Sequence, residues 1–342
     1  MKEKTGNVFS GEHALFSYLA PGSLGPTPLV ELPEALNLYA KDKVRIFVKL
    51  MQFVPLSNIK SLPAYLMLWK IPAKKLTKIK NLVEYSSGNT VLSLSILSKY
   101  FGIENMHAII TPDVPEHKKR LLRLVGANLL ISHGPPSPGV FDSVGGIADA
   151  KKLGKKVGWH NFNQYINPAN PGAAKDFVGK ELWQQLARDL SIFVASIGTG
   201  GTILGAGSYL KSKNKKVKII GTAIKEGSSI PGPRGEGMID KLGFPWRKAV
   251  DEVIAMDEKS AYGGSLELIR AGLFVGPSTG MQYRALLSKI KEYKRKKTLK
   301  NLRNKRGEVL ATFVACDTMF PYIDDYFAIL PESYFPKIKH LK

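Results

Sequence analysis

The chain has 342 residues, an apolar content of 44% and a formal net charge of +22. This length exceeds one ordinary domain and the apolar content supplies a large buried core, so we expect two lobes. The single cysteine excludes an internal disulfide, and no uninterrupted apolar run approaches the roughly 20 residues of a membrane span. The first five residues lack the apolar region of a secretion signal, and we therefore expect a cytoplasmic protein.

Short apolar runs alternate with helical patterns along the chain, as in a parallel sheet whose strands are joined by crossover helices. We expect strands over residues 44–49, 82–85, 107–110, 128–132, 192–197, 217–220 and 309–315. We expect helices over residues 63–69, 91–101, 116–125, 147–153, 173–190, 203–212, 260–271 and 279–293. The sequence therefore predicts an α/β fold.

A turn of five small residues joins a buried strand to a helix: Gly198, Thr199, Gly200, Gly201 and Thr202. Glycines let the main chain approach an anion closely, and the N-terminus of the helix adds a partial positive charge. The turn therefore predicts a phosphate cup. A dinucleotide fingerprint would need glycine where Ile203 stands, and no Gly-Lys-Ser or Gly-Lys-Thr closes the turn as in a P-loop.

A second polar turn also follows a predicted strand and precedes a helix: Ser86, Ser87, Gly88, Asn89 and Thr90. A single Ser, Asn or Thr suffices as a helix N-cap, which contributes about 1 kcal/mol. Four hydrogen-bonding side chains exceed that need. We interpret the turn as a site for the carboxylate of an amino acid and the hydroxyl of a ring, with helix capping as the alternative.

Motifs of one enzyme group occur in a fixed order over nearly the whole chain. They lie at residues 25–30, 57–60, 87–90, 164–165, 167–171, 198–202, 231–233 and 276–280, and at Asp317 ahead of Tyr322. With these motifs the chain resembles the cysteine synthase and cystathionine β-synthase group. These are tryptophan synthase β-like (fold type II) enzymes that use pyridoxal 5′-phosphate (PLP). The resemblance implies a two-lobed fold with parallel sheets flanked by helices.

The resemblance assigns the cofactor contacts to particular residues. It implies that Lys60 forms the imine with PLP, a role that needs a primary amine partly deprotonated by burial. Lys60 precedes the largely apolar residues 62–69, among which a free ammonium is costly. The resemblance further implies that Asn89 contacts the ring hydroxyl and that the cup of residues 198–202 holds the phosphate.

Ser278 matches the residue that binds the pyridine nitrogen of PLP in this fold type. A hydroxyl does not hold a proton on that nitrogen, so the ring is a weaker electron sink and β-elimination is favoured over transamination. For the substrate, the resemblance implies that Ser86, Ser87, Gly88 and Thr90 bind the α-carboxylate and that Gln164 assists. Ser86 and Gln164 could instead cap a helix or bond the main chain.

The resemblance also implies where the cofactor lies. A smaller lobe, residues 45–155, would carry the lysine and the polar turn. A larger lobe, residues 1–44 and 156–342, would carry the phosphate cup and Ser278. We expect the Gly- and Pro-rich loop over residues 227–237 at the cleft between them, no metal, and a homodimer.

The reaction implied by the resemblance is β-replacement on an activated serine, O-acetylserine or O-phosphoserine, with sulfide or a thiol to give cysteine or a related amino acid. The positive charge favours O-phosphoserine. Cystathionine β-synthase and serine/threonine dehydratase activities remain alternatives. Ser61 and Leu62 stand where the family usually has Asp and Arg, and Val91 replaces a glycine. These departures leave the acceptor open.

Lysines and arginines gather in residues 289–306. We favour a solvated surface over nucleic-acid or membrane binding, because no zinc spacing, RNA-binding aromatic signature or helix-turn-helix pattern accompanies the charge. A non-catalytic paralogue that binds a macromolecule through this face is the alternative class. A binding module has no use for an imine-forming lysine, which favours an enzyme. Cys316 follows an apolar strand, and we expect it to be a core thiol.

Overall fold

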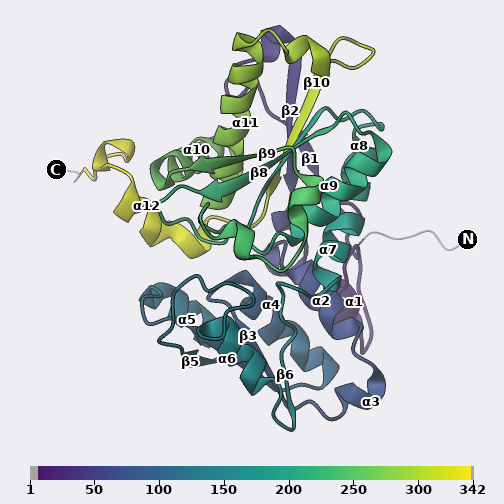
Figure 1. The fold of residues 1–342 in the computed structure, drawn as a ribbon, viewed down its shortest axis with the longest axis vertical. Helices are drawn as coiled ribbons and strands as arrows, with labels where there is room; N and C mark the ends of the chain where they lie inside the picture. Colours follow the sequence, from purple (N-terminus) through teal and green to yellow (C-terminus); the bar gives the residue numbers. More distant parts are fainter. Residues whose placement is uncertain (1–6, 340–342) are drawn as a thin grey trace, which may run out of the picture.

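The computed structural model describes residues 7–339, and its larger sheet has six strands (Figure 1). Their order is β1-β2-β10-β7-β8-β9, with bounds β1 Leu29–Glu31, β2 Val44–Leu50, β10 Val309–Ala315, β7 Ile192–Ser196, β8 Lys218–Ile224 and β9 Glu252–Met256. All neighbouring strands are parallel except β1, which pairs with β2 in the antiparallel sense. The carboxyl ends of the parallel strands therefore share one edge of this sheet.

A smaller, entirely parallel sheet has the order β5-β4-β3-β6. Its bounds are β3 Asn81–Tyr85, β4 Asn105–Ile110, β5 Ala127–Ile131 and β6 Trp159–His160. The helices are α1 Ala14–Leu19, α2 Ser61–Trp69, α3 Ala73–Leu76, α4 Asn89–Leu97, α5 Glu116–Leu124, α6 Gly146–Leu153, α7 Ala169–Ala174, α8 Lys180–Gln185, α9 Gly201–Lys213, α10 Glu258–Arg270, α11 Pro277–Arg295 and α12 Ile323–Ile329. Between residues 7 and 339, no helix is both long and apolar enough to span a membrane.

Alternate residues of the larger sheet face two different helical layers. Ile46 and Val48 join the buried cluster that contains Leu286 of α11, whereas Phe47 joins the cluster that contains Ile203 of α9. Successive side chains of a strand point to opposite faces, so the strands are covered on both sides. Figure 1 shows α4, α5 and α6 with the smaller sheet in the lower lobe and α9, α10 and α11 with the larger sheet in the upper lobe. The predicted α/β fold is confirmed.

The helix predicted over residues 173–190 is wrong at both ends. The segment begins at Ala169, passes through a π-helical turn, Lys175–Gly179, and ends with α8 at Gln185. Pro171 is tolerated because it lies in the first turn, where its missing N–H has no helical partner to lose. Ala187 and Arg188 both have positive φ, which stops the helix.

The helix predicted over residues 91–101 starts earlier, at Asn89, and tightens into the 3₁₀ turn Ser98–Phe101. Asn89 and Thr90 therefore belong to the first turn of α4. The sequence prediction omitted β1, β6, β9, α1, α3 and α12. β1 and β6 are too short, at 3 and 2 residues, to show a periodic pattern, and all of β9 is only half-buried.

Sheet membership differs from the expected lobe boundaries at residues 45 and 155. Residues 45–50 were expected in the smaller lobe, but they belong to strand β2, which pairs with β10 in the larger sheet. Strand β6 pairs with β3 in the smaller sheet, although it follows residue 155. The pairing partners of a strand are long-range contacts, which local sequence patterns do not specify.

A buried ion pair connects the N-terminal segment to the larger lobe. Lys49 of β2 is fully buried, and its Nζ donates to Glu181 at 2.5 Å, Gln185 at 2.8 Å and the Thr27 carbonyl at 2.9 Å. Burial lowers the pKa of Lys49, and the hydrogen bond and charge of Glu181 oppose that shift. The ammonium therefore depends on Glu181 for neutralisation.

We expect Glu181→Ala to lower the free energy of unfolding by about 3 kcal/mol, because it leaves a buried ammonium without a counter-charge. Urea denaturation measures this change. Asp176→Ala is the matched control, since Asp176 pairs with Lys180 at 2.7 Å where both side chains are 45% exposed. That control should cost less than about 0.5 kcal/mol. Equal losses in the two variants would contradict the buried-pair interpretation.

Candidate active site

Lys60 lies at the edge of the larger sheet where its parallel strands end. It is the N-cap residue of α2 and is half-buried. The Ile59 N–H donates to the Cys316 carbonyl at 2.8 Å, and Asn58 forms a β-bridge with Asp317. These contacts hold the lysine beside the end of β10. Burial lowers the pKa of the Lys60 ammonium, while the charges of Cys316 and Asp317 oppose that shift.

The predicted phosphate cup lies between β7 and α9. Gly200 has a φ of +82°, and a Cβ on Gly198 would come within 2.6 Å of the Gly232 carbonyl oxygen, so both positions require glycine. Thr199 Oγ1 accepts from Asn170 Nδ2 at 2.9 Å and from the Gly201 N–H at 3.2 Å. The free N–H groups in the first turn of the 13-residue α9 make this turn suited to an anion.

Lys60 and Thr202, the last residue of the cup, line one small cavity. It is lined by Ile59, Lys60, Leu62, Pro63, Asn170, Ala173, Ala174 and Thr202. The amine on α2 and the anion-binding turn at α9 are more than 130 positions apart in the sequence but meet here. The tertiary structure therefore brings Lys60 close to the end of the predicted phosphate cup.

The polar turn after β3 is joined to Gln164. Thr90 Oγ1 donates to Gln164 Oε1 at 2.7 Å, and Gln164 Nε2 donates to the Tyr85 carbonyl at 3.3 Å. Ser86 Oγ accepts from the Gly88 N–H at 3.3 Å, which agrees with its alternative reading as a local turn residue. Ser87 is half-buried beside them. The structure thus brings together the residues expected to hold an α-carboxylate.

Asn89 and the start of α11 both contact Asp317. Ser278 is buried in the first turn of α11, and Gly276, two residues before it, donates its N–H to the Asp317 carbonyl at 3.1 Å. Asn89 Nδ2 and the Tyr322 hydroxyl each donate to Asp317 Oδ2 at 2.6 Å. Asp317 Oδ1 is buried and has no hydrogen-bond partner among residues 7–339.

The sequence analysis assigned no role to Asp317 or Tyr322. Burial raises the pKa of Asp317, while the hydrogen bonds from Tyr322 and Asn89 and the charge of Lys60 oppose the shift. One signal was available: Asp317 is a carboxylate just past the end of a buried strand, at the edge where parallel-sheet proteins bind ligands. Which side chains it would meet could not be read from that position.

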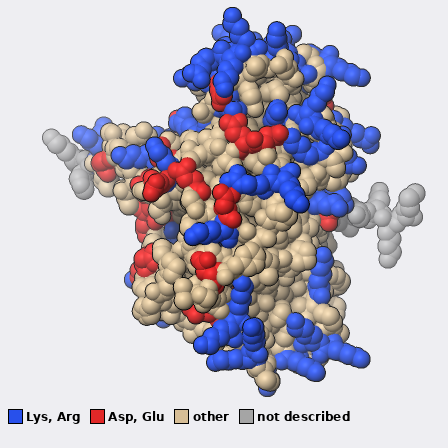
Figure 2. Space-filling model, in the orientation of Figure 1, with Lys and Arg blue, Asp and Glu red and all other residues tan. Residues whose placement is uncertain are grey.

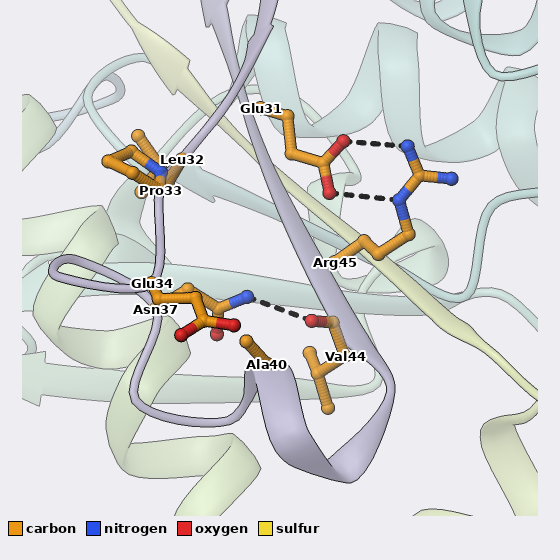
Figure 3. A pocket seen from close by; sticks show the side chains of 8 residues that line it. All are labelled: Glu31, Leu32, Pro33, Glu34, Asn37, Ala40, Val44 and Arg45. Carbon is orange, nitrogen blue, oxygen red and sulfur yellow. Dashed lines mark hydrogen bonds and ion pairs between the residues drawn. The ribbon is translucent and has the colours of Figure 1, made fainter.

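A second hollow lies at the other end of β2, away from Lys60. Figure 3 shows Glu31, Glu34, Asn37 and Arg45 among the side chains that line it. The Arg45 guanidinium is already paired with Glu31, at 2.9 and 2.6 Å. This hollow borders the amino end of β2 and is lined by none of the predicted site residues. We therefore do not assign it to the candidate active site.

Comparisons with known proteins support the same grouping. The model of the pyridoxal-phosphate dependent enzyme family matches residues 21–301. This chain belongs to that family. Cysteine synthase B of Salmonella typhimurium is 32% identical over 263 residues, which are 75% of this chain and 83% of that protein. The cysteine synthase of Staphylococcus aureus strain N315 is 30% identical over 301 residues, covering 83% and 92% of the two chains.

The fold of this chain is similar to those of solved enzyme structures. The crystal structure of O-ureido-L-serine synthase is 25% identical, with a TM-score of 0.72 over 90% of this chain and 93% of that one. O-acetyl serine sulfhydrylase isoform 3 of Entamoeba histolytica is 24% identical with a TM-score of 0.70, which supports the fold alone. The expected fold type II architecture and the dependence on PLP are therefore confirmed.

The residues of this PLP enzyme fit the cofactor. Burial of Lys60 favours its neutral, nucleophilic amine, and the glycines of the cup leave room for a phosphate at the N-terminus of α9. Asn89 and Ser278 offer neutral polar groups from opposite lobes. The orphan Asp317 Oδ1 shows that this pocket retains unused hydrogen-bonding capacity.

Two expectations outside the cofactor contacts need correction. Lys289 is not part of a solvated face: it is 5% exposed and paired with Glu252 and with Glu292, the latter at 2.8 Å. Cys316 is half-buried and not a fully enclosed core thiol. Burial and the charge of Asp317 raise the Cys316 pKa, and the nearby Lys60 charge opposes the shift.

We expect borohydride reduction of the PLP-loaded protein to fix one pyridoxyl group on Lys60, because an amine with a lowered pKa condenses with an aldehyde. Peptide mass mapping locates the label. Lys60→Arg is the control, since a guanidinium keeps the charge but does not condense. A label on Lys49 or Lys289, two lysines that are buried more deeply than Lys60, would contradict the assignment.

We expect Gly201→Val to weaken PLP binding roughly tenfold or more, because a displaced turn loses charge-assisted hydrogen bonds to the phosphate. A Cβ at Gly201 would overlap the side chain of Asn170, which braces the turn through Thr199. Titration of the apoprotein with PLP measures the affinity. Gly263→Ala in α10, where a Cβ meets open space, is the control. Unchanged affinity in a folded Gly201→Val variant would remove the cup from the phosphate site.

Proposed function

We propose that this enzyme performs β-replacement on an activated serine, exchanging the group on Cβ for sulfide to give cysteine. The observation that carries the proposal is that Asn170 joins three expected parts of the site. It lines one cavity with Lys60 and Thr202, and its Nδ2 donates to Thr199 Oγ1 of the cup and to the carbonyl of Gln164, which pairs with Thr90. Relatives named cysteine synthase at 30–32% identity support the same reaction. We further propose that it acts as a homodimer in the cytoplasm, as the family resemblance implies.

Bound PLP supplies the electron sink that allows the Cα–H bond and the bond to the β substituent to break. Lys60 would hold the cofactor, and its Nζ would take the Cα proton and later return it. Its lowered pKa favours the neutral form that accepts this proton. Ser278 would offer a hydroxyl to the pyridine nitrogen, and a hydroxyl does not hold a proton there, which would disfavour transamination.

The remaining residues orient the substrate. Ser86, Ser87, Gly88 and Thr90 would bind the α-carboxylate with hydroxyls and main-chain N–H groups at the start of α4, where the helix dipole favours an anion. The Thr90 hydroxyl has one proton to donate. It forms a hydrogen bond to Gln164 Oε1 here and would turn toward the α-carboxylate when the substrate binds. Asp317 positions the Asn89 amide by accepting a hydrogen bond from it at Oδ2. The Tyr322 hydroxyl donates to the same oxygen and fixes the carboxylate.

The charge distribution supports an enzyme more than a non-catalytic binding paralogue. Figure 2 shows Lys and Arg side chains gathered at the top of the molecule, where α11 ends in Figure 1. This end of the larger lobe is separated from the junction of the lobes that holds Lys60. Binding of a macromolecule to that basic surface would need neither a buried amine at Lys60 nor a glycine turn suited to phosphate, whereas PLP chemistry needs both.

We expect the purified, PLP-loaded protein to form cysteine from sulfide and either O-acetylserine or O-phosphoserine. Amino-acid analysis measures the product. Thr90→Val should raise the KM for the serine ester roughly tenfold, because it removes a hydroxyl that would bind the carboxylate while keeping the shape of the side chain. Its kcat and PLP absorbance should change much less.

Two controls accompany this experiment. Lys60→Ala should abolish cysteine formation, and Thr77→Val, an exposed threonine at the end of α3, should leave KM unchanged. Formation of pyruvate or transamination products in place of cysteine would overturn the β-replacement proposal. A Thr90→Val variant with wild-type KM would instead remove Thr90 from the substrate site.

A further inference from the structure

Arg234 is a buried arginine in the Gly- and Pro-rich loop expected at the cleft, and its side chain is 6% exposed. Its main chain is anchored to the carboxyl edge of the larger sheet: its N–H donates to the Ile197 carbonyl at 2.8 Å, and its carbonyl accepts from the Ile224 N–H at 2.9 Å. Ile197 directly precedes the phosphate cup. The backbone of Arg234 therefore lies beside the residue that precedes the cup.

The Arg234 charge has no counter-ion. Among residues 7–339 no carboxylate lies within ion-pair distance, and the one side-chain hydrogen bond runs from Nη1 to the Pro138 carbonyl at 2.8 Å. The guanidinium also lies over the Tyr165 ring, 4.9 Å from its centroid. A guanidinium has five N–H donors, and a buried cation is normally paired with an anion. Arg234 thus has donors and charge available for a ligand.

The neighbours of Arg234 place it beside the expected substrate. Tyr165, under the guanidinium, follows Gln164, which bonds Thr90. Tyr85 directly precedes the polar turn. Burial raises the pKa of Tyr85 to about 12, and the positive charge of Arg234 opposes that shift. On the other side, Gly232 of the same loop packs against Gly198 of the cup. Arg234 therefore stands between the cup and the polar turn.

We propose that Arg234 binds an oxyanion on the group that leaves from Cβ of the donor, and that the donor is O-phosphoserine. The inference rests on the proposed function. Two other anions of the reaction already have sites, the PLP phosphate in the cup and the α-carboxylate at the start of α4. The phosphate of the donor is the remaining one. A planar guanidinium suits it because it donates to two phosphate oxygens at once.

The chemistry balances with a phosphate leaving group. The Cβ–O bond of O-phosphoserine breaks and its electron pair leaves with the phosphate oxygen. The sulfur of hydrogen sulfide forms the new Cβ–S bond, so O-phosphoserine and hydrogen sulfide yield cysteine and inorganic phosphate. Arg234 stabilises the negative charge that grows on the departing phosphate, in a pocket where little water screens it.

The test compares two donors with the full-length, PLP-loaded enzyme. We expect the wild type to have a higher kcat/KM for O-phosphoserine than for O-acetylserine. Arg234→Gln should lower kcat/KM for O-phosphoserine roughly 10- to 100-fold, since it removes charge-assisted hydrogen bonds, and should change the value for O-acetylserine little. Arg234→Lys, which keeps the charge but loses the planar donor pair, should give an intermediate loss.

Two further measurements keep the proposal testable if Arg234→Gln folds poorly. Inorganic phosphate should inhibit the wild type in competition with the donor, and this competition should weaken in Arg234→Lys. Arg303→Gln, at an exposed position of the basic segment, is the control for one lost positive charge.

The possible failures can be told apart. Equal losses for both donors would show that Arg234 only braces the loop and would overturn the inference. Turnover of O-acetylserine alone would overturn it while the proposed function stands. Cysteine from neither ester would overturn both.

Discussion

The site depends on the burial of one ammonium, that of Lys60, at the edge where the parallel strands of the larger sheet end. Burial favours the neutral amine, and the charge of Asp317 limits the shift. The main-chain contacts of Asn58 and Ile59 with the end of β10 hold the lysine there. The loop after β7 reaches the same edge, which places an anion-binding turn next to the amine.

Two charged side chains, Asp317 and Arg234, make contacts that connect the two lobes. Asp317 receives two hydrogen bonds through one oxygen and keeps the other free, so it ties Asn89 of the smaller lobe to Tyr322 of the larger. Arg234 reaches across in the opposite direction, to the loop that contains Pro138. Both contacts connect substrate-binding elements to the scaffold of the larger lobe, so movement between the lobes would act directly on the site.

Buried lysines in this chain show how surroundings decide chemical behaviour. Lys49 is paired with Glu181 and surrounded by further acceptors, so it serves the structure. Lys289 is likewise paired, with Glu252 and Glu292, and its pKa is raised by these hydrogen bonds against the effect of burial. Lys60 is half-buried and has no direct ion pair among residues 7–339, and burial lowers its pKa. Of the three, its amine is the one free to react.

Local sequence was sufficient for the elements with strong periodicity and for the turns that need small residues. The strand at Val309–Ala315 and the glycine turn at 198–202 were both predicted, because apolar runs and glycines act through the local backbone. The partners of Asp317 and Arg234 could not be predicted, since they come from segments distant in sequence and are set by sheet order and packing. The assignment of residues 45–50 to the smaller lobe was wrong for the same reason, because strand pairing is a long-range contact.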